Sequence, residues 1–125
     1  MKIESVIKLY CKCLVKNDLK VILSLFSADA IINSPKVKNE TAPKFYAHLF
    51  KTSRRTKVSV KHIFYELSSN NLFAAWLDYE GITGGKASNI CFECVDIFEF
   101  DTNNKIKQLT IIWDTYPVRS QLDQM

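Results

Sequence analysis

The chain lacks the features that would set it apart from ordinary globular proteins. Its 125 residues include only three glycines and three prolines, so a collagen-like or disordered chain is not expected. No apolar run approaches 18 residues, and no membrane association is expected. Glu4, Lys8 and Lys12 interrupt the N-terminal apolar stretch, which argues against a secretion signal. The composition, 47% hydrophobic and 24% charged, predicts one domain over residues 1–125, located in the cytoplasm.

The four cysteines form two close pairs, and neither pair has the geometry of a local metal site. Cys11 and Cys13 lie two residues apart on a predicted helix, about 200° around its axis. Cys91 and Cys94 lie an odd number apart on a predicted strand, so they point to opposite faces. A zinc site built from all four is the alternative, although no tight turn presents either pair. We therefore expect no metal and the cysteine chemistry of a reducing compartment.

The net charge of +4 is modest, and much of it is concentrated in one stretch. The basic residues of that stretch are Lys51, Arg54, Arg55, Lys57 and Lys61. Such a run can bind nucleic acid, but more often it is a solvated loop. No aromatic residue is interleaved between positions 51 and 61, as stacking on single strands requires. We expect a solvated loop and no nucleic-acid partner.

The first half of the chain has helical periodicity. Apolar residues at intervals of three and four predict a first helix with the stripe Ile3, Val6, Ile7, Tyr10 and Leu14. Asp18 offers an N-cap for a short second helix. Residues 30–33 are predicted to form a short strand that ends before Pro35. Thr41 can cap a third helix, whose predicted buried face is Phe45, Tyr46, Leu49 and Phe50.

The second half has the period of two that is typical of strands. Four strands are predicted: Val58–Leu67, Leu72–Glu80, Ala87–Phe100 and Ile106–Asp114. Short turn-like links between them imply an antiparallel meander. Helices followed by strands indicate an α+β fold, with three N-terminal helices packed in the concave face of a curved, mainly antiparallel sheet.

Asp96 is the most informative residue, because it is an acid on the apolar face of its strand. Alternate residues share a face, which places Asp96 with Ile90, Phe92, Cys94, Phe98 and Phe100. A carboxyl among these side chains must be paired with a partner or kept neutral by a raised pKa. Two interpretations follow: an acid in a ligand pocket, or an acid satisfied by a neighbouring hydroxyl or amide with no chemistry.

Several segments, in their order and spacing, resemble one family. They are Tyr10–Leu14, Asn17–Leu19, Leu25–Ala30, Ser34–Pro35, Val95–Phe100 and Lys105–Ile106. The sequence is similar to the ketosteroid isomerase and SnoaL-like polyketide cyclase group, within the nuclear transport factor superfold. The resemblance covers nearly the whole chain. It implies a cone-shaped, cystatin-like roll, a homodimer, and a hydrophobic pocket that works without a cofactor.

The resemblance also implies roles for particular residues. In ketosteroid isomerases a tyrosine of the first helix and a protonated aspartic acid form an oxyanion hole, and Tyr10 and Asp96 match them. The alternative interpretation is that Tyr10 is simply an aromatic residue of the core. A second aspartate, just before a proline, moves the proton in that family. Here Ser34 holds that position, preceded by Asn33, and neither side chain accepts a proton usefully at neutral pH.

A replacement base would have to come from elsewhere in the cavity, and three candidates remain open. Asp114 follows Trp113, but alternation places it opposite the inner residues unless a bulge intervenes. His62 shares a predicted face with Val58 and Val60, although a lone histidine on an apolar face is more often simply packed. Asp78 is the third candidate, and pairing with a lysine of a neighbouring strand is its simpler interpretation.

Two functions follow from these observations. The first is a pocket for a small, largely apolar molecule with a carbonyl or hydroxyl, held by Tyr10 and Asp96. Ser34 and Asn33 are further candidate ligand-binding residues, and Phe92, Phe98 and Trp113 are the expected lining. Its chemistry would be isomerisation or cyclisation by proton transfer next to a carbonyl. The second is a non-catalytic, dimeric binding or interaction module of the same fold.

Overall fold

The computed structural model describes residues 2–69, 71–83 and 89–116 of the chain. Within these residues lie three helices and six strands. In chain order they are α1 (Ile3–Lys16), α2 (Leu19–Ser24), β1 (Phe26–Asn33), β2 (Glu40–Thr41), α3 (Ala42–Thr52), β3 (Ser53–Tyr65), β4 (Leu72–Thr83), β5 (Asn89–Phe100) and β6 (Ile106–Ile112).

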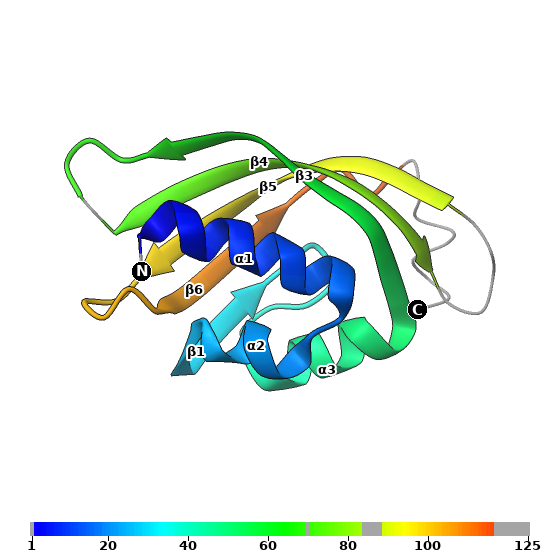
Figure 1. The fold of residues 1–125 in the computed structure, drawn as a ribbon, viewed down its shortest axis with the longest axis horizontal. Coiled ribbons are helices and arrows are strands. Elements are labelled where there is room, and N and C mark those ends of the chain that lie inside the picture. The colour runs from blue at the N-terminus through cyan, green and yellow to red at the C-terminus, as the bar shows by residue number, and fades with distance from the viewer. Residues whose placement is uncertain (1, 70, 84–88, 117–125) are drawn as a thin grey trace.

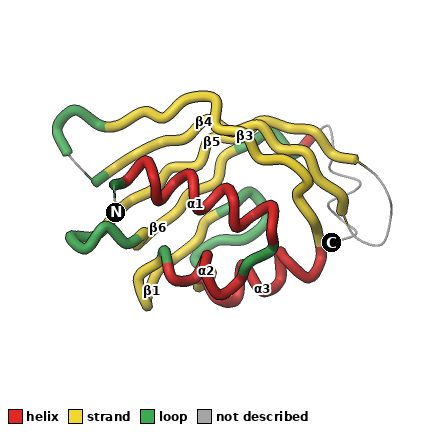
Figure 2. Tube along the Cα trace, viewed as in Figure 1, coloured by secondary structure: helices red, strands yellow, loops and turns green. Residues whose placement is uncertain are grey.

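The six strands form one curved sheet in the order β2-β1-β6-β5-β4-β3. All neighbours are antiparallel except β1 and β6, which run parallel. The helices lie in the hollow of this sheet, with α1 beneath the arch of β3, β4 and β5 (Figures 1 and 2). The predicted α+β architecture, with the helices on the concave face of a mainly antiparallel sheet, is confirmed.

The helix boundaries follow from local chemistry. The helix α1 buries the predicted stripe and ends at Asn17, whose left-handed φ of 51° stops the helix. The Asp18 carboxylate then accepts a hydrogen bond from the backbone N–H of Val21 at 3.1 Å, which is the expected cap of α2. Thr41 precedes α3 as predicted, but its side chain makes no capping hydrogen bond.

The inner face of β5 has the alternation that the sequence predicts. Ile90, Cys94, Asp96, Phe98 and Phe100 are all buried, and Phe92 is half-buried. The alternate residues on the other face are exposed or half-buried, including the exposed Cys91. Asp96 is therefore a core position, 0% exposed, in the middle of the sheet. Its strand neighbours are Ala75 of β4 and Ile111 of β6.

Two strands begin earlier than predicted. The strand β1 begins at Phe26 rather than at residue 30. The strand β3 begins at Ser53, so the basic stretch is not the expected solvated loop but the end of α3 and the first half of a strand. A long strand could not be recognised there because four of its first five residues, Ser53–Lys57, are polar or charged but not β-branched. The link between the second and third predicted strands contains Gly84 and Gly85, where a turn is expected, and both residues lie outside the described part of the chain.

Two bulges in β3 change which side chains point inward. The pairing of β3 with β4 shifts register between Arg55 and Lys57 and again between Val60 and His62. Each bulge adds one residue and so exchanges the two faces. As a result Arg55 is buried on the same side as Val58 and Val60, and His62 is exposed on the opposite side.

Candidate ligand-binding pocket

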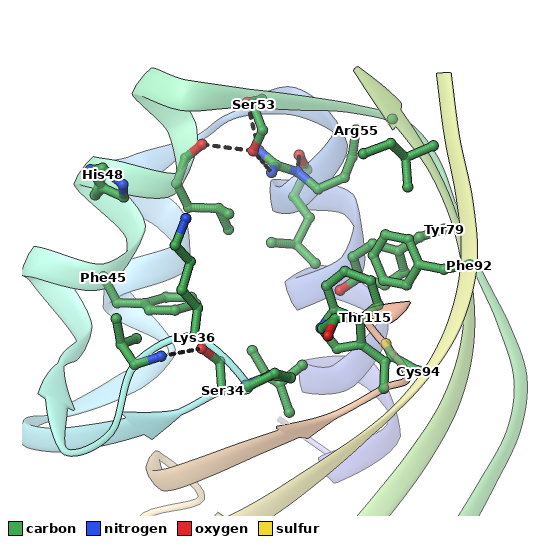
Figure 3. A pocket seen from close by; sticks show the side chains of 18 of the residues that line it. Ser34, Lys36, Phe45, His48, Ser53, Arg55, Tyr79, Phe92, Cys94 and Thr115 are labelled. Carbon is green, nitrogen blue, oxygen red and sulfur yellow. Dashed lines mark hydrogen bonds between the residues drawn. The ribbon is translucent and has the colours of Figure 1, made fainter. Parts of the chain in front are cut away.

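A pocket of about 210 Å³ opens between the concave face of the sheet, the helices α1 and α3, and the loop after β1. Figure 3 shows its walls, with Phe45 and His48 of α3 facing Tyr79 and Phe92 of the sheet across the cavity. The surface that faces the cavity is mostly apolar, as in small-molecule sites generally, although about half of the lining residues are polar or titratable. The polar and titratable lining residues are Tyr10, Ser34, Lys36, Glu40, His48, Ser53, Arg54, Arg55, Tyr79, Cys94 and Thr115.

One wall of the pocket is a group of packed rings. Phe92 of β5 stacks on Trp113, with centroids 4.0 Å apart and planes 22° from parallel. Tyr79 of β4 packs on the other side of Phe92 at 5.0 Å. These three rings form a continuous apolar surface, suited to a flat hydrocarbon group.

Tyr10 lines the pocket, and its hydroxyl forms a hydrogen bond with that of a second tyrosine. Its oxygen lies 2.6 Å from the hydroxyl oxygen of Tyr46 on α3, and either hydroxyl can donate. Tyr46 is fully buried and does not line the pocket, whereas Tyr10 does. Burial raises the pKa of both phenols well above the ordinary value, so both are neutral donors at pH 7.

Asp96 does not line the pocket, whereas Cys94, the preceding inward residue of β5, does. The Cys94 thiol donates to Oδ1 of Asp96 at 3.4 Å, and Oδ2 has no hydrogen-bond partner. Burial raises the pKa of Asp96 from 3.8 to about 7, and the thiol lowers it only in part. Negative charge on Asp96 would in turn raise the pKa values of Tyr10, Tyr46 and Tyr79. The carboxyl is thus surrounded by neutral groups that disfavour its ionisation.

The structure brings part of the predicted site together. Tyr10, Ser34, Phe92 and Trp113 line the pocket. The Ser34 hydroxyl oxygen accepts from the N–H of Val37 at 3.2 Å and shapes the loop below the cavity.

Three other predicted residues do not line the pocket. Asn33 accepts from the N–H of Asn39 at 2.8 Å. Phe98 is a core residue, edge-on to Tyr10 at 5.3 Å. Asp96 is not at the pocket surface, and its hydrogen bond is to Cys94 rather than to Tyr10.

The replacement bases considered from the sequence all lie elsewhere. Asp114 is exposed and accepts from the backbone N–H of Tyr116, because the alternation of β6 continues without a bulge that would turn Asp114 inward. His62 is exposed beside Trp76, turned outward by the second bulge of β3. Asp78 lies 3.9 Å from Lys61 of the neighbouring strand, as its simpler interpretation predicted. None of the three lines the pocket.

Solved structures match this fold over nearly the whole chain, whereas no protein-family model and no curated protein matches the sequence. The epoxide hydrolase/cyclase-like enzyme SalBIII, described for pyran ring formation in the polyether salinomycin, has a TM-score of 0.77 and 14% identity over 91% of this chain and 92% of its own. An NTF2-like protein from Cytophaga hutchinsonii has a TM-score of 0.72 and 14% identity over 95% and 96%.

A candidate SnoaL-like polyketide cyclase from Shewanella putrefaciens has a TM-score of 0.73 and 14% identity over 100% of this chain and 99% of its own. The chain has the SnoaL-like, NTF2-type fold. At such low identity the likeness establishes the fold and not a reaction. The function of this chain therefore depends on the residues of its own pocket.

Sequence reasoning missed one charged residue in the wall of the pocket. Arg55 is 6% exposed, whereas the sequence predicts that it belongs to a solvated basic loop. Its Nε donates to the carbonyl of Leu14 at 3.1 Å, and Nη2 donates to Oδ1 of Asn17 at 2.8 Å. Nη1 donates to the hydroxyl of Ser53 at 2.7 Å. The available signal was weak, because only the bulge after Arg55 places it in phase with the inward-facing valines.

Two groups at the rim can accept a proton. Glu40 of β2 is half-buried and His48 of α3 is exposed, and both line the pocket. Neither was considered from the sequence, because neither falls on an apolar face of a predicted element. A carboxylate and an imidazole are the usual general bases at neutral pH. The pocket therefore has proton acceptors at its rim, although not at the position of Ser34.

Among the described residues no group of three or more histidine, cysteine or acidic side chains lies close enough to hold a metal ion. Three of the four cysteines are buried, and all four are free thiols. None of the helices in the described part of the chain is long and apolar enough to cross a membrane.

Proposed function

We propose that this protein binds a small, largely apolar molecule that carries a carbonyl or hydroxyl oxygen. The observation that carries the proposal is Tyr10, which lines an apolar pocket and whose hydroxyl is held by that of Tyr46 at 2.6 Å. If Tyr46 donates to Tyr10, the proton of Tyr10 is directed toward a ligand oxygen. The stacked rings of Phe92 and Trp113 would hold the hydrocarbon part.

The chemistry that this arrangement favours is cofactor-free proton transfer next to a carbonyl, as in isomerisation or cyclisation. A base removes the proton from the α carbon, and negative charge develops on the carbonyl oxygen as an enolate. Tyr10 would donate to that oxygen from a site where water is largely excluded. Burial raises the pKa of Asp96 to about 7, so this acid carries less negative charge near neutral pH than an ordinary aspartate and opposes the enolate less. Glu40 and His48 are the proposed bases.

Ligand binding can be tested with a matched pair of probes, 2-acetylnaphthalene and 2-ethylnaphthalene, of which only the first has a carbonyl. The indole N–H of Trp113 is the NMR reporter, and the variant Trp76→Phe assigns it because the chain has two tryptophans. We expect both probes to shift the Trp113 signal and leave that of Trp76 unchanged. Tyr10→Phe should lower the affinity for the ketone by about tenfold, the effect of one hydrogen bond. The affinity for the hydrocarbon should not change.

Ketone binding with no loss in Tyr10→Phe would contradict the role of the hydroxyl. No shift of the Trp113 signal with any probe would contradict the pocket itself.

Turnover can be tested without knowledge of the natural substrate. In D₂O, proton transfer should exchange the methyl protons of 2-acetylnaphthalene for deuterium, which NMR detects as loss of the methyl signal. We expect the wild-type protein to accelerate this exchange and either Glu40→Gln or His48→Gln to abolish the acceleration. Glu66→Gln is a matched control, since Glu66 is an exposed carboxylate after β3 and does not line the pocket. Exchange at the uncatalysed rate would leave binding as the function.

A second candidate function is that of a non-catalytic, dimeric interaction module. It is favoured by exposed apolar side chains on the outer face of the sheet, where Ile112 is 52% exposed and Val95, its partner in the β5–β6 ladder, is 36% exposed. A second copy of this chain is the proposed partner. Light scattering on Ile112→Glu should show monomers if this face pairs two sheets. A dimer unaffected by the substitution would reject this interface.

The location that fits either function is the cytoplasm. A reducing compartment keeps thiols free, and all four cysteines are free.

A further inference from the structure

Arg55 is the most deeply buried cation described, and its side-chain partners are all uncharged. The guanidinium donates to the carbonyls of Leu14 and Ser53, to the hydroxyl of Ser53 and to the amide oxygen of Asn17. One face of it lies over the ring of Phe50, 5.3 Å from the centroid. No acidic side chain among the described residues forms an ion pair with it.

Part of this arrangement is structural. Leu14 belongs to the last turn of α1, where the carbonyl groups lack partners within the helix and carry partial negative charge. Arg55 therefore ties the end of α1 to the start of β3. These partial charges do not neutralise a full positive charge held away from water, and burial lowers the pKa of Arg55 as a result.

The guanidinium also retains capacity for a ligand. It has five N–H groups, and its four hydrogen bonds use Nε once, Nη1 once and Nη2 twice. One N–H of Nη1 has no acceptor among these bonds. Arg55 lines the same pocket as Tyr10 and the stacked rings (Figure 3). A ligand in this pocket would therefore meet a buried, uncompensated positive charge.

We propose that the ligand of this pocket carries a carboxylate, which Arg55 binds, in addition to the apolar part that lies on Phe92 and Trp113. This inference rests on the proposed function and defines its ligand class. The anion would supply the missing counter-charge, and hydrogen bonds between charged groups are the strongest that a side chain makes. The volume of about 210 Å³ lies below the roughly 300–1000 Å³ of pockets for drug-sized ligands, which favours an acid with one or two rings.

The test uses the wild-type protein with 2-naphthoate and 2-naphthamide, which have nearly the same shape and differ in charge. Binding is followed at pH 7 by the Trp113 indole signal. We expect the acid to bind about tenfold more tightly than the amide, as a charged hydrogen bond in a dry site predicts. The variant Arg55→Gln should remove this preference by lowering the affinity for the acid and not that for the amide.

Lys57→Gln is the matched control for loss of one positive charge. Lys57 lies on the same strand, is exposed and does not line this pocket. Its loss should leave the preference for the acid unchanged. Arg55→Gln also removes the hydrogen bond that ties the end of α1 to β3. Arg55→Lys is therefore a second variant, which keeps the positive charge and should retain part of the preference for the acid. Circular dichroism establishes that each variant is folded, and the wild-type comparison needs no variant.

The outcomes separate this inference from the proposed function. Equal affinity of the wild-type protein for acid and amide would overturn the role of Arg55 and leave the pocket intact. A preference for the acid that survives in Arg55→Gln would also overturn the role of Arg55. It would assign the preference to the exposed pocket cations Lys36 and Arg54. If the acid, the amide and the ketone all fail to bind, both the inference and the proposed function are wrong.

Discussion

The thiol of Cys94 lies 3.4 Å from Oδ1 of Asp96 and donates to it. The two residues are successive inward positions of β5, and only Cys94 reaches the pocket surface. A thiol is a weak donor, so it stabilises the carboxylate far less than an ammonium or a backbone N–H would. The pair therefore leaves Asp96 a mostly uncompensated acid, with a pKa of about 7, directly behind the pocket wall.

The strength of this hydrogen bond should control the pKa of Asp96. The Cys94 thiol lowers that pKa, so Cys94→Ala should raise it above about 7. Cys94→Ser, which substitutes a stronger O–H donor, should lower it. Carbon-13 NMR of the aspartate carboxyls measures both. Cys91→Ser is the control, because Cys91 is exposed on the opposite face. The same pKa in the Ala and Ser variants would show that the thiol is not a partner.

Stability should depend on pH through Asp96. Its folded pKa of about 7 exceeds the unfolded value of 3.8, so the native state binds more protons between these values and its stability falls as pH rises through this range. At about 1.4 kcal/mol per pH unit, the full loss is on the order of 4 kcal/mol by pH 8. Urea unfolding at pH 4.5 and pH 8 should show most of this loss in the wild-type protein, about 3 kcal/mol, because the rest already occurs below pH 4.5.

Asp96→Asn is the matched variant for that experiment, because the amide does not titrate. We expect Asn to remove this part of the pH dependence and to make the variant more stable than the wild type at pH 8. Parallel pH curves for the two proteins would mean that Asp96 does not titrate in this range.

The two tyrosine hydroxyls should act as a coupled pair. Removing either one in Tyr10→Phe or Tyr46→Phe leaves the other buried without its partner, at a cost of about 1–3 kcal/mol. The double variant leaves neither unpaired, so its loss should be smaller than the sum. A double-mutant cycle in urea gives the coupling energy. Strict additivity would contradict the hydrogen bond.

Gly81 should be required for the position of Arg55. It pairs with Arg55 across the β3–β4 ladder, and a Cβ added at Gly81 would lie 2.6 Å from the carbonyl oxygen of Arg54. Because that atom is backbone, β3 would have to move at its first bulge. We expect Gly81→Ala to cost about 1–3 kcal/mol of stability and to weaken binding of 2-naphthoate. Ala74→Gly, which alters a half-buried position of the same strand, tests whether β4 is sensitive in general.

Most of the fold could be predicted from the sequence because its periodicities are regular. The stripe of α1, the cap at Asp18 and the alternation of β5 depend on local chemistry, and all three appear in the structure. The same alternation placed Asp96 in the core. Alternation assigns a residue to one face of the strand. It could not predict which of the two inward residues, Cys94 or Asp96, reaches the cavity.

The candidate site was harder to predict because it depends on irregular features of β3. Plain alternation places His62 inward and gives no reason to place Arg55 inward. In the structure the first bulge brings Arg55 to the inner face, and the second turns His62 to the outer face. Bulges have no reliable signal in a single sequence. The partner of Tyr10 is also a tertiary effect, since Tyr46 is 36 residues away on another helix.

The central claim is that burial at the centre of the protein raises the pKa of Asp96 to about 7. Carbon-13 NMR of its side-chain carboxyl, assigned by comparison with Asp96→Asn and followed from pH 3 to pH 9, tests this claim most directly. The structure predicts a midpoint near 7, about three pH units above an ordinary aspartate. A midpoint near 4 would show that Asp96 is charged at neutral pH and would contradict the account.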